Sequence, residues 1–220
     1  MLIQISGVLD GAALASLDAA LGQLTWQDGR ATAGWAAKLV KANEQAPAGD
    51  ATAGALKHQF SQCILGNDVF QLAVRPKALS PLLISRTLTG MSYGTHVDDA
   101  LMAGMRSDVS FTLFLSDPAS YDGGELVIES AAGEEDVKLP AGGLVAYPAS
   151  ALHHVATVSR GVRYAAVGWA RSFVRSAEQR ELLFDLDTAR RSLFARDGKS
   201  PEFDLISKCS ANLLRAWAED

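Results

Sequence analysis

The hydrophobic pattern of residues 67–172 changes from a helical period to a strand-like one. Residues 109–115 alternate polar with apolar side chains, as a strand with one buried face does. Glycine-containing turn signals follow at 121–125, 140–143 and 159–161. Short strands separated by such turns predict a sandwich or a double-sheet barrel rather than a parallel sheet with helical crossovers. The predicted strands are residues 2–5, 69–74, 81–86, 109–115, 126–128, 137–139, 144–147, 153–158 and 162–171.

Helical patterns flank this β-core on both sides. After Asp10, a predicted N-cap, leucines recur at three- and four-residue steps, and residues 36–44 and 51–65 are rich in helix formers. Beyond residue 172 apolar side chains again recur at helical spacing as far as Trp217. We therefore expect a mainly β protein in three segments. These are a mainly helical N-terminal segment (1–66), the β-core (67–172) and a C-terminal helical extension (173–220).

Composition and charge exclude several classes of protein. A net charge of -5 argues against general nucleic-acid binding, which requires a basic face. No uninterrupted apolar stretch is long enough to span a bilayer, and the first residues have no basic n-region of a signal peptide. Cys63 and Cys209 match no zinc or redox spacing. We expect a cytoplasmic protein with no membrane partner and with reduced, buried thiols.

The motif His96-Val97-Asp98 indicates a metal site. Residues two apart on a strand share a face, so His96 and Asp98 present an imidazole and a carboxylate side by side. A histidine from a distant strand would complete the two-histidine, one-carboxylate triad that binds Fe(II) and leaves positions open. Of the other histidines, His58 lies in a helical stretch and is expected on the surface, which leaves His153 and His154.

The choice between His153 and His154 depends on the turn before Arg163. If residues 159–161 form a three-residue loop, the two strands pair so that His153 shares a face with Arg163. A two-residue turn at 160–161 would instead place His154 on that face. The spacing alone leaves both open. Glycine in the left-handed position of a three-residue loop favours His153, with His154 facing outward or supporting a ligand.

Three further side chains are candidates for the same site. Arg163 lies in an apolar strand, where a guanidinium requires an anionic partner, and a carboxylate fits its fork geometry. Trp169, on the same face, could line a pocket or pack in the core. Tyr93 would project away from His96 on a regular strand, but a bulge at Gly94 would turn it inward.

Together these residues resemble the iron(II)- and 2-oxoglutarate-dependent dioxygenases of the prolyl-4-hydroxylase-like branch, and more narrowly the bacterial PKHD-type hydroxylases. The resemblance extends over nearly the whole chain, through residues 26–34, 93–98, 123–126, 147–148, 152–153, 158–163 and 212–217. It implies a double-stranded β-helix (jelly-roll-like) core. It also implies that His96, Asp98 and His153 bind iron, and that Arg163 binds the distal carboxylate of 2-oxoglutarate.

One position departs from the family pattern, which often has an Arg-Tyr pair before the first ligand where this chain has Arg86-Thr87. A tyrosine contact to 2-oxoglutarate is then missing, or Tyr93 supplies it. Related halogenases lack the carboxylate ligand, so Asp98 favours hydroxylation. The implied reaction consumes O2 and 2-oxoglutarate, hydroxylates an unactivated C–H bond, and releases succinate and CO2. Ascorbate is a candidate reductant.

Two alternatives remain open at this stage. A cupin-like metal-dependent isomerase or lyase would need the metal but neither Arg163 nor 2-oxoglutarate, and a non-catalytic metal-binding or sensory module would use the helical ends to dock a partner. The substrate of the dioxygenase could be peptidyl proline or lysine, a siderophore or another small metabolite. The apolar faces of the terminal helices could support a homodimer or simply cover the core.

Overall fold

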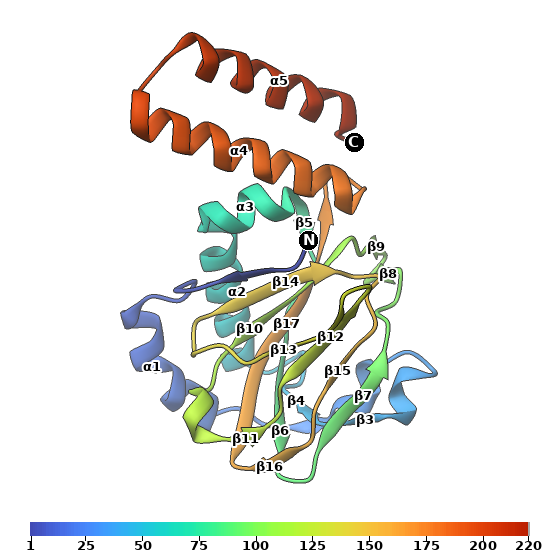
Figure 1. Cartoon of the computed structure of the whole chain (residues 1–220). Helices are drawn as coiled ribbons and strands as arrows, with labels where there is room; N and C mark the ends of the chain where they lie inside the picture. The colour runs from blue at the N-terminus through green and yellow to red at the C-terminus, as the bar shows by residue number, and fades with distance from the viewer. Residues whose placement is uncertain (220) are drawn as a thin grey trace.

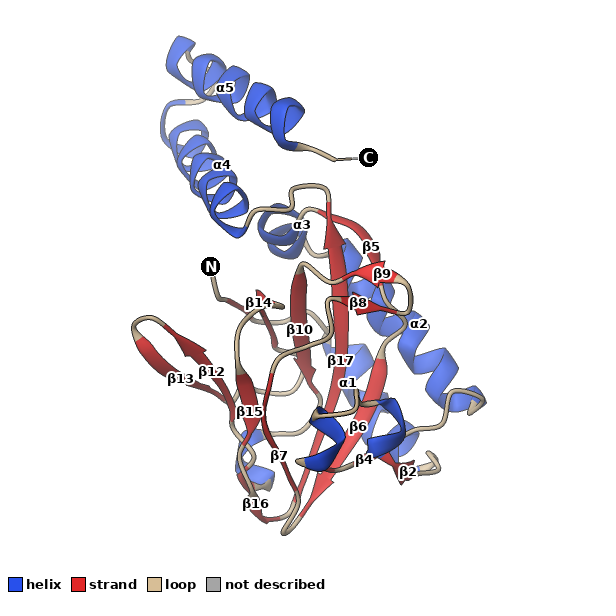
Figure 2. Ribbon diagram, turned by 90° about the vertical axis from the view of Figure 1, so that its right-hand side faces the viewer, coloured by secondary structure: helices blue, strands red, loops and turns tan. Residues whose placement is uncertain are grey.

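The computed structural model describes residues 1–219, in which two antiparallel β-sheets face each other (Figures 1 and 2). The strands of the larger sheet are, in order, β1 (Ile3–Ile5), β14 (Leu144–Pro148), β10 (Val109–Phe114), β17 (Val162–Ser172), β6 (Leu83–Leu88), β4 (Glu44–Gln45) and β2 (Gln27–Asp28), with β5 (Pro76–Leu79) beside β17. Those of the smaller sheet are β13 (Gly133–Val137), β12 (Leu126–Ser130), β15 (His153–Val155), β7 (Ser92–His96) and β3 (Lys41–Ala42). The predicted jelly-roll-like core with helical ends is confirmed.

Two short strand pairs lie beside the sheets: β8 (Leu101–Met102) with β9 (Met105–Arg106), and β11 (Asp122–Gly123) with β16 (Val158–Arg160). The helices are α1 (Gly11–Gly22), α2 (Ala51–Gly66), α3 (Asp68–Val74), α4 (Ala177–Asp197) and α5 (Pro201–Trp217). The side chain of Asp10 caps α1 by accepting from the Ala13 N–H, as the sequence predicts. Within residues 1–219 no helix combines the length and apolar composition needed to cross a bilayer.

The main hydrophobic core lies between the larger sheet and helices α1, α2 and α3, which cover its outer face (Figure 2). Phe111 of β10 and Phe70 of α3 meet edge to face, with ring centroids 5.5 Å apart. Gly168 of β17 makes room for this packing, because a Cβ at this position would lie 2.6 Å from the Phe111 ring. Helices therefore cover one face of the larger sheet, and its other face is directed towards the smaller sheet.

Two secondary-structure predictions are wrong, the first of them throughout its length. Residues 69–74, predicted as a strand, belong to helix α3, because Asn67 caps the helix and Phe70, Ala73 and Val74 bury one face of it. Residues 36–44, predicted as helical, form only a single 3-10 turn, η2 (Ala37–Leu39), followed by strands β3 and β4. Pairing of β3 with β7 and of β4 with β6 overrides the local helix propensity.

The two cysteines also differ from expectation. Both are free, but Cys63 is only half-buried and Cys209 on α5 is exposed, so the predicted burial of both thiols is wrong. Helix α5 packs against α4, away from the sheets, and this arrangement leaves its far side in solvent (Figure 1).

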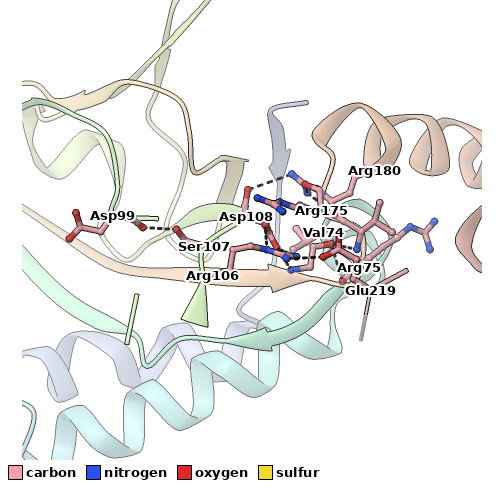
Figure 3. A network of polar contacts seen from close by, with 11 residues as sticks. Val74, Arg75, Asp99, Arg106, Ser107, Asp108, Arg175, Arg180 and Glu219 are labelled. Atoms are coloured by element: carbon pink, nitrogen blue, oxygen red, sulfur yellow. Dashed lines mark hydrogen bonds and ion pairs between the residues drawn. The ribbon is translucent and has the colours of Figure 1, made fainter. Parts of the chain in front are cut away.

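A network of charged side chains joins the C-terminal helices to the end of the larger sheet (Figure 3). The buried Asp108 carboxylate accepts from the Arg106 guanidinium and from the Ser172 N–H. Arg106 also donates to Glu219, the last residue that the structure describes. Arg180 of α4, 4% exposed, donates to the carbonyls of Val174 and Arg175. These contacts fix the start of α4 relative to the sheet.

A buried ion pair should make a large contribution to holding α4 in place. Asp187 of α4 is 3% exposed and contacts both Arg75 and Arg190 at 2.6 Å. Removing its carboxylate leaves the Arg75 charge unpaired, so Asp187→Ala should lower the free energy of unfolding by about 3 kcal/mol. Asp185→Ala, at an exposed position on the same helix, should change it by less than about 0.5 kcal/mol. Equal urea midpoints for the two variants would contradict this prediction.

Candidate metal centre and its pocket

The structure brings His96, Asp98 and His153 together between the two sheets. His96 ends β7, His153 begins β15, and their Cα atoms are direct partners across the antiparallel pair. Asp98 follows β7 by two residues. One ligand atom from each residue lies within 4.8 Å of the other two. The distant histidine that the sequence analysis required is therefore His153.

The hydrogen bonds of this cluster leave the correct atoms free for a metal. The Nδ1 of His96 lies 2.9 Å from the Gly94 carbonyl and that of His153 lies 3.1 Å from the Ala151 carbonyl, so each Nδ1–H donates. Each Nε2 then carries a lone pair directed into the cluster. Ser110 donates to Asp98 Oδ2 at 2.5 Å, which fixes that carboxylate and leaves Oδ1 unengaged.

Distances within the cluster also fit a shared ion. The His96 Nε2 lies 4.0 Å from Asp98 Oδ1, and the His153 Nε2 lies 3.8 Å from Asp98 Oδ2. These separations are too long for hydrogen bonds. They are shorter than two metal–nitrogen bonds of about 2.1 Å each placed end to end, so one ion could contact all three groups. Two neutral imidazoles and a carboxylate form the donor set of the facial triad.

Electrostatics keeps the first histidine neutral. Burial, followed by the neighbouring His153, lowers the pKa of His96 to about 4. Its imidazole therefore remains unprotonated at neutral pH, as a metal ligand must be.

The predicted hairpin before Arg163 is wrong, although His153 is the histidine in the cluster. Strand β16 pairs with β11, not with β17, and Arg163 of β17 pairs instead with Thr87 of β6. His153 and Arg163 lie on different sheets and face each other across the space between them. Side-chain alternation along β15 places the neighbouring His154 opposite Val127 and outside the pocket lining. His58 is exposed on α2, as expected.

Tyr93 faces the cluster because of a bulge. His153 pairs with His96 and Val155 with Tyr93, so three steps on β7 oppose two on β15. The Tyr93 ring consequently stacks on the His96 ring, with centroids 3.7 Å apart. Gly94 is needed at the bulge, because a Cβ there would lie 2.8 Å from the Cβ of Val40. The bulge predicted from this glycine is confirmed.

The cluster lines a pocket of about 830 Å³, its open mouth included. Trp169 and Thr87 both line this pocket. The indole Nε1 of Trp169 is buried and has no hydrogen-bond partner among the described residues. Further lining side chains are Lys41, Gln45, Leu83, Ser85, Val97, Asp99, Met102, Thr112, Leu126, Tyr147, Val155 and Val167.

Arg163 presents a buried charge to this pocket. It is 3% exposed, its guanidinium lies 5.4 Å from the centroid of the Phe114 ring, and its Nε has no hydrogen-bond partner among the described residues. Burial lowers its pKa, while the nearby Tyr121 hydroxyl opposes that effect. Within residues 1–219 no carboxylate forms an ion pair with it. The site is therefore suited to an anion supplied from outside.

Two residues of the site, Ser110 and Lys41, were not identified from sequence. The sequence did contain a signal for Ser110. Ser110 and Thr112 lie on the same face of strand β10, and a buried polar face of a strand indicates a site. Lys41 carried no comparable signal, because its strand has only two residues and lies in a stretch with helix propensity.

Comparison with protein families gives two matches. The model of the 2OG-Fe(II) oxygenase superfamily matches residues 82–171, and that of the PKHD-type hydroxylase C-terminal domain matches residues 178–219. A PKHD-type hydroxylase of Picosynechococcus sp. is 53% identical over 219 residues, and one of Maricaulis maris is 52% identical over 220 residues. Each alignment covers 100% of both chains.

Solved structures share the fold at low sequence identity. A prolyl-4-hydroxylase of Pseudomonas putida aligns with a TM-score of 0.55 and 21% identity, over 78% of this chain and 92% of that one. A prolyl hydroxylase of Trichoplax adhaerens, solved with a peptide fragment of the hypoxia inducible factor oxygen degradation domain, aligns with a TM-score of 0.60 and 13% identity, over 83% and 86%.

Proposed function

The chain belongs to the PKHD-type hydroxylases of the 2OG-Fe(II) oxygenase superfamily, and from this membership we propose that His96, Asp98 and His153 bind its iron(II) and that Arg163 binds the distal carboxylate of 2-oxoglutarate. One observation carries the proposal. The three metal-ligand side chains and a buried arginine without a carboxylate partner line the same pocket, although they come from both sheets.

The protein is a 2-oxoglutarate- and iron(II)-dependent dioxygenase, which confirms the predicted oxidoreductase over the cupin-like and non-catalytic alternatives. When bound, the iron supplies oxidative chemistry that couples conversion of 2-oxoglutarate to succinate and CO2 with hydroxylation of a substrate C–H bond. The residues of the chain position the reactants and exclude water. Neither family membership nor fold identifies the substrate.

The proposed roles follow from the geometry. Ser110 orients the carboxylate of Asp98, and the Gly94 and Ala151 carbonyls fix the tautomers of the two histidines. The Tyr93 ring covers one face of His96 and restricts its rotation. Since Tyr93 belongs to the pocket lining, we assign its hydroxyl a supporting contact to 2-oxoglutarate in place of the tyrosine missing at Thr87.

Arg163 is held ready for a dicarboxylate. Desolvating a guanidinium without a partner is costly, and a bidentate carboxylate recovers much of that cost. The face of Phe114 limits the directions in which the guanidinium can turn. Ascorbate as the reductant and a cytoplasmic location complete the proposal. The family resemblance supports the first, and two cysteines without zinc or redox spacing support the second. A peptidyl or a small-molecule substrate is compatible with the pocket.

The two adjacent histidines provide a direct test of the ligand assignment. Under anaerobic conditions, Fe(II) and 2-oxoglutarate should together give the wild type a weak visible charge-transfer band. His153→Ala should lose this band and retain no stoichiometric iron after desalting. His154→Ala, which changes the same side chain one residue away but on the other face of β15, should retain both. The assignment is wrong if the two variants exchange these results, or if the wild type gives no band.

A further inference from the structure

Lys41 presents a second buried cation to the pocket. It lies on β3, at the edge of the smaller sheet, and pairs with Tyr93 of β7. Its side chain is 7% exposed and lines the same pocket as the metal-ligand cluster and Arg163. Lysine is seldom buried unless it is paired, so its presence in this position needs a reason.

The contacts of Lys41 leave much of its ammonium group unsatisfied. The Nζ donates to the Thr32 hydroxyl at 3.2 Å and lies 5.0 Å from the centroid of the Tyr93 ring. An ammonium has three donors, and among residues 1–219 only this one hydrogen bond and no ion pair with a carboxylate involve it. Burial lowers the pKa of Lys41 to about 8, with Asp98 and Asp28 opposing this effect, so the group is still largely charged at neutral pH.

Charge balance in the loaded pocket indicates what is missing. Iron(II) and the 2-oxoglutarate dianion cancel each other, and Asp98 cancels Arg163. The remaining charged residues of the lining are Lys41 and Asp99, of which Asp99 is exposed to solvent. Lys41 therefore leaves one uncompensated positive charge in a buried site, where charges are weakly screened.

We propose that Lys41 is a specificity-determining residue that binds a carboxylate of the primary substrate, so that the enzyme hydroxylates a monoanionic acid. This inference rests on the proposed function, because it assumes that Arg163 and the metal already engage the two ends of 2-oxoglutarate. The substrate acid then neutralises the last buried charge.

The rest of the lining constrains the remainder of that acid. The lining includes the apolar side chains of Leu83, Met102 and Val167. Val97 also lines the pocket and is half-exposed, which places it at the mouth. A neutral, largely apolar body attached to one carboxylate complements such a surface, whereas a second charge would be desolvated without a partner.

The test uses matched pairs of probes that differ only in charge. Wild-type protein is loaded anaerobically with Fe(II) and 2-oxoglutarate, and calorimetry then measures binding of N-acetylated apolar amino acids and of their carboxamides. In at least one pair the acid should bind about 10- to 100-fold more tightly than the amide, as expected for a charged hydrogen bond in a buried site. Lys41→Met should bring this ratio close to one while leaving the Kd of 2-oxoglutarate unchanged.

Two further variants separate recognition from structure. Lys41→Arg keeps the charge and should preserve a preference for acids. Lys38→Met removes an exposed lysine of the preceding 3-10 turn, which is not part of the pocket lining, and should preserve the full ratio. A purely structural role for Lys41 would weaken acids and amides equally in Lys41→Met, and that result would overturn the proposal.

Other outcomes are equally decisive. The proposal is overturned if the wild-type protein shows no preference for the acid in any pair of probes. The same holds if it binds none of the probes. A Lys41→Met variant that loses 2-oxoglutarate but keeps the ratio also overturns the proposal, because Lys41 would then belong to the co-substrate site. Failure of the proposed function is recognised earlier and separately: wild type and Lys41→Met would both fail to take up iron and 2-oxoglutarate before any probe is added.

Discussion

Arg163→Met is expected to weaken the binding of 2-oxoglutarate strongly while the protein still binds iron. Methionine fills a similar volume but offers no donor to a carboxylate. Removing one partner of a buried, hydrogen-bonded charge pair costs about 2–5 kcal/mol, which corresponds to a Kd raised from about 30-fold to several thousandfold. Calorimetric titration of the iron-loaded protein with 2-oxoglutarate, without oxygen, measures this directly.

The same substitution should not destabilise the protein without its ligands. Arg163 is 3% exposed and forms no ion pair within residues 1–219, so its burial is a cost in the absence of an anion. Thermal unfolding of the ligand-free variant should therefore occur at the wild-type temperature or above it. Wild-type protein alone should gain stability when 2-oxoglutarate is added.

Arg160→Met is the matched control. Arg160 lies three residues earlier, is exposed and pairs with Asp122, so its loss should leave the Kd of 2-oxoglutarate unchanged. If Arg163→Met bound 2-oxoglutarate as tightly as Arg160→Met, the role proposed for Arg163 would be wrong. A large loss of stability in Arg163→Met would instead indicate that the guanidinium has a structural function.

Asp98→Ala should remove stoichiometric iron binding and all turnover. Its carboxylate is the only anionic donor of the cluster. Without that charge, the two neutral imidazoles bind Fe(II) too weakly to compete with its hydration in solution. Ser110→Ala should give a graded effect, about 10- to 100-fold in iron affinity, because it removes only the hydrogen bond that orients Asp98. Metal content after dialysis against a graded chelator distinguishes the two levels.

Asp99→Ala provides the control for charge alone. Asp99 adjoins Asp98 and lines the pocket, but its carboxylate is exposed and stands outside the three-residue cluster. This variant should bind iron as the wild type does. Iron affinity reduced equally in Asp98→Ala and Asp99→Ala would show that the general negative charge of the loop, rather than coordination by Asp98, attracts the metal.

Local patterns in the sequence were sufficient for several features. The alternation at 109–115 predicted the strand correctly, because the side-chain period of a strand is set by its backbone. The expected single buried face is wrong, because every residue of β10 is buried, the polar Ser110 and Thr112 included. The spacing of two residues predicted that His96 and Asp98 lie together, although Asp98 follows the end of β7 and is not part of the strand. The glycine at 94 indicated the bulge that turns Tyr93 inward. The division of the chain at residues 66 and 172, the homodimer and the absence of nucleic-acid partners stay predictions.

Only the tertiary structure decided which distant segments meet. The pairing of β17 with β6, and of β15 with β7, placed Arg163 and His153 on opposite sheets, although the nearest turn suggested that they share a hairpin. Sheet pairing also placed most of residues 41–44, which have a helical pattern, in strands and directed Lys41 into the pocket. The periodicity of a strand or helix depends on neighbouring residues and can be recognised locally. Which strands pair depends on the burial of side chains across the whole chain, so no local segment of the sequence contains that information.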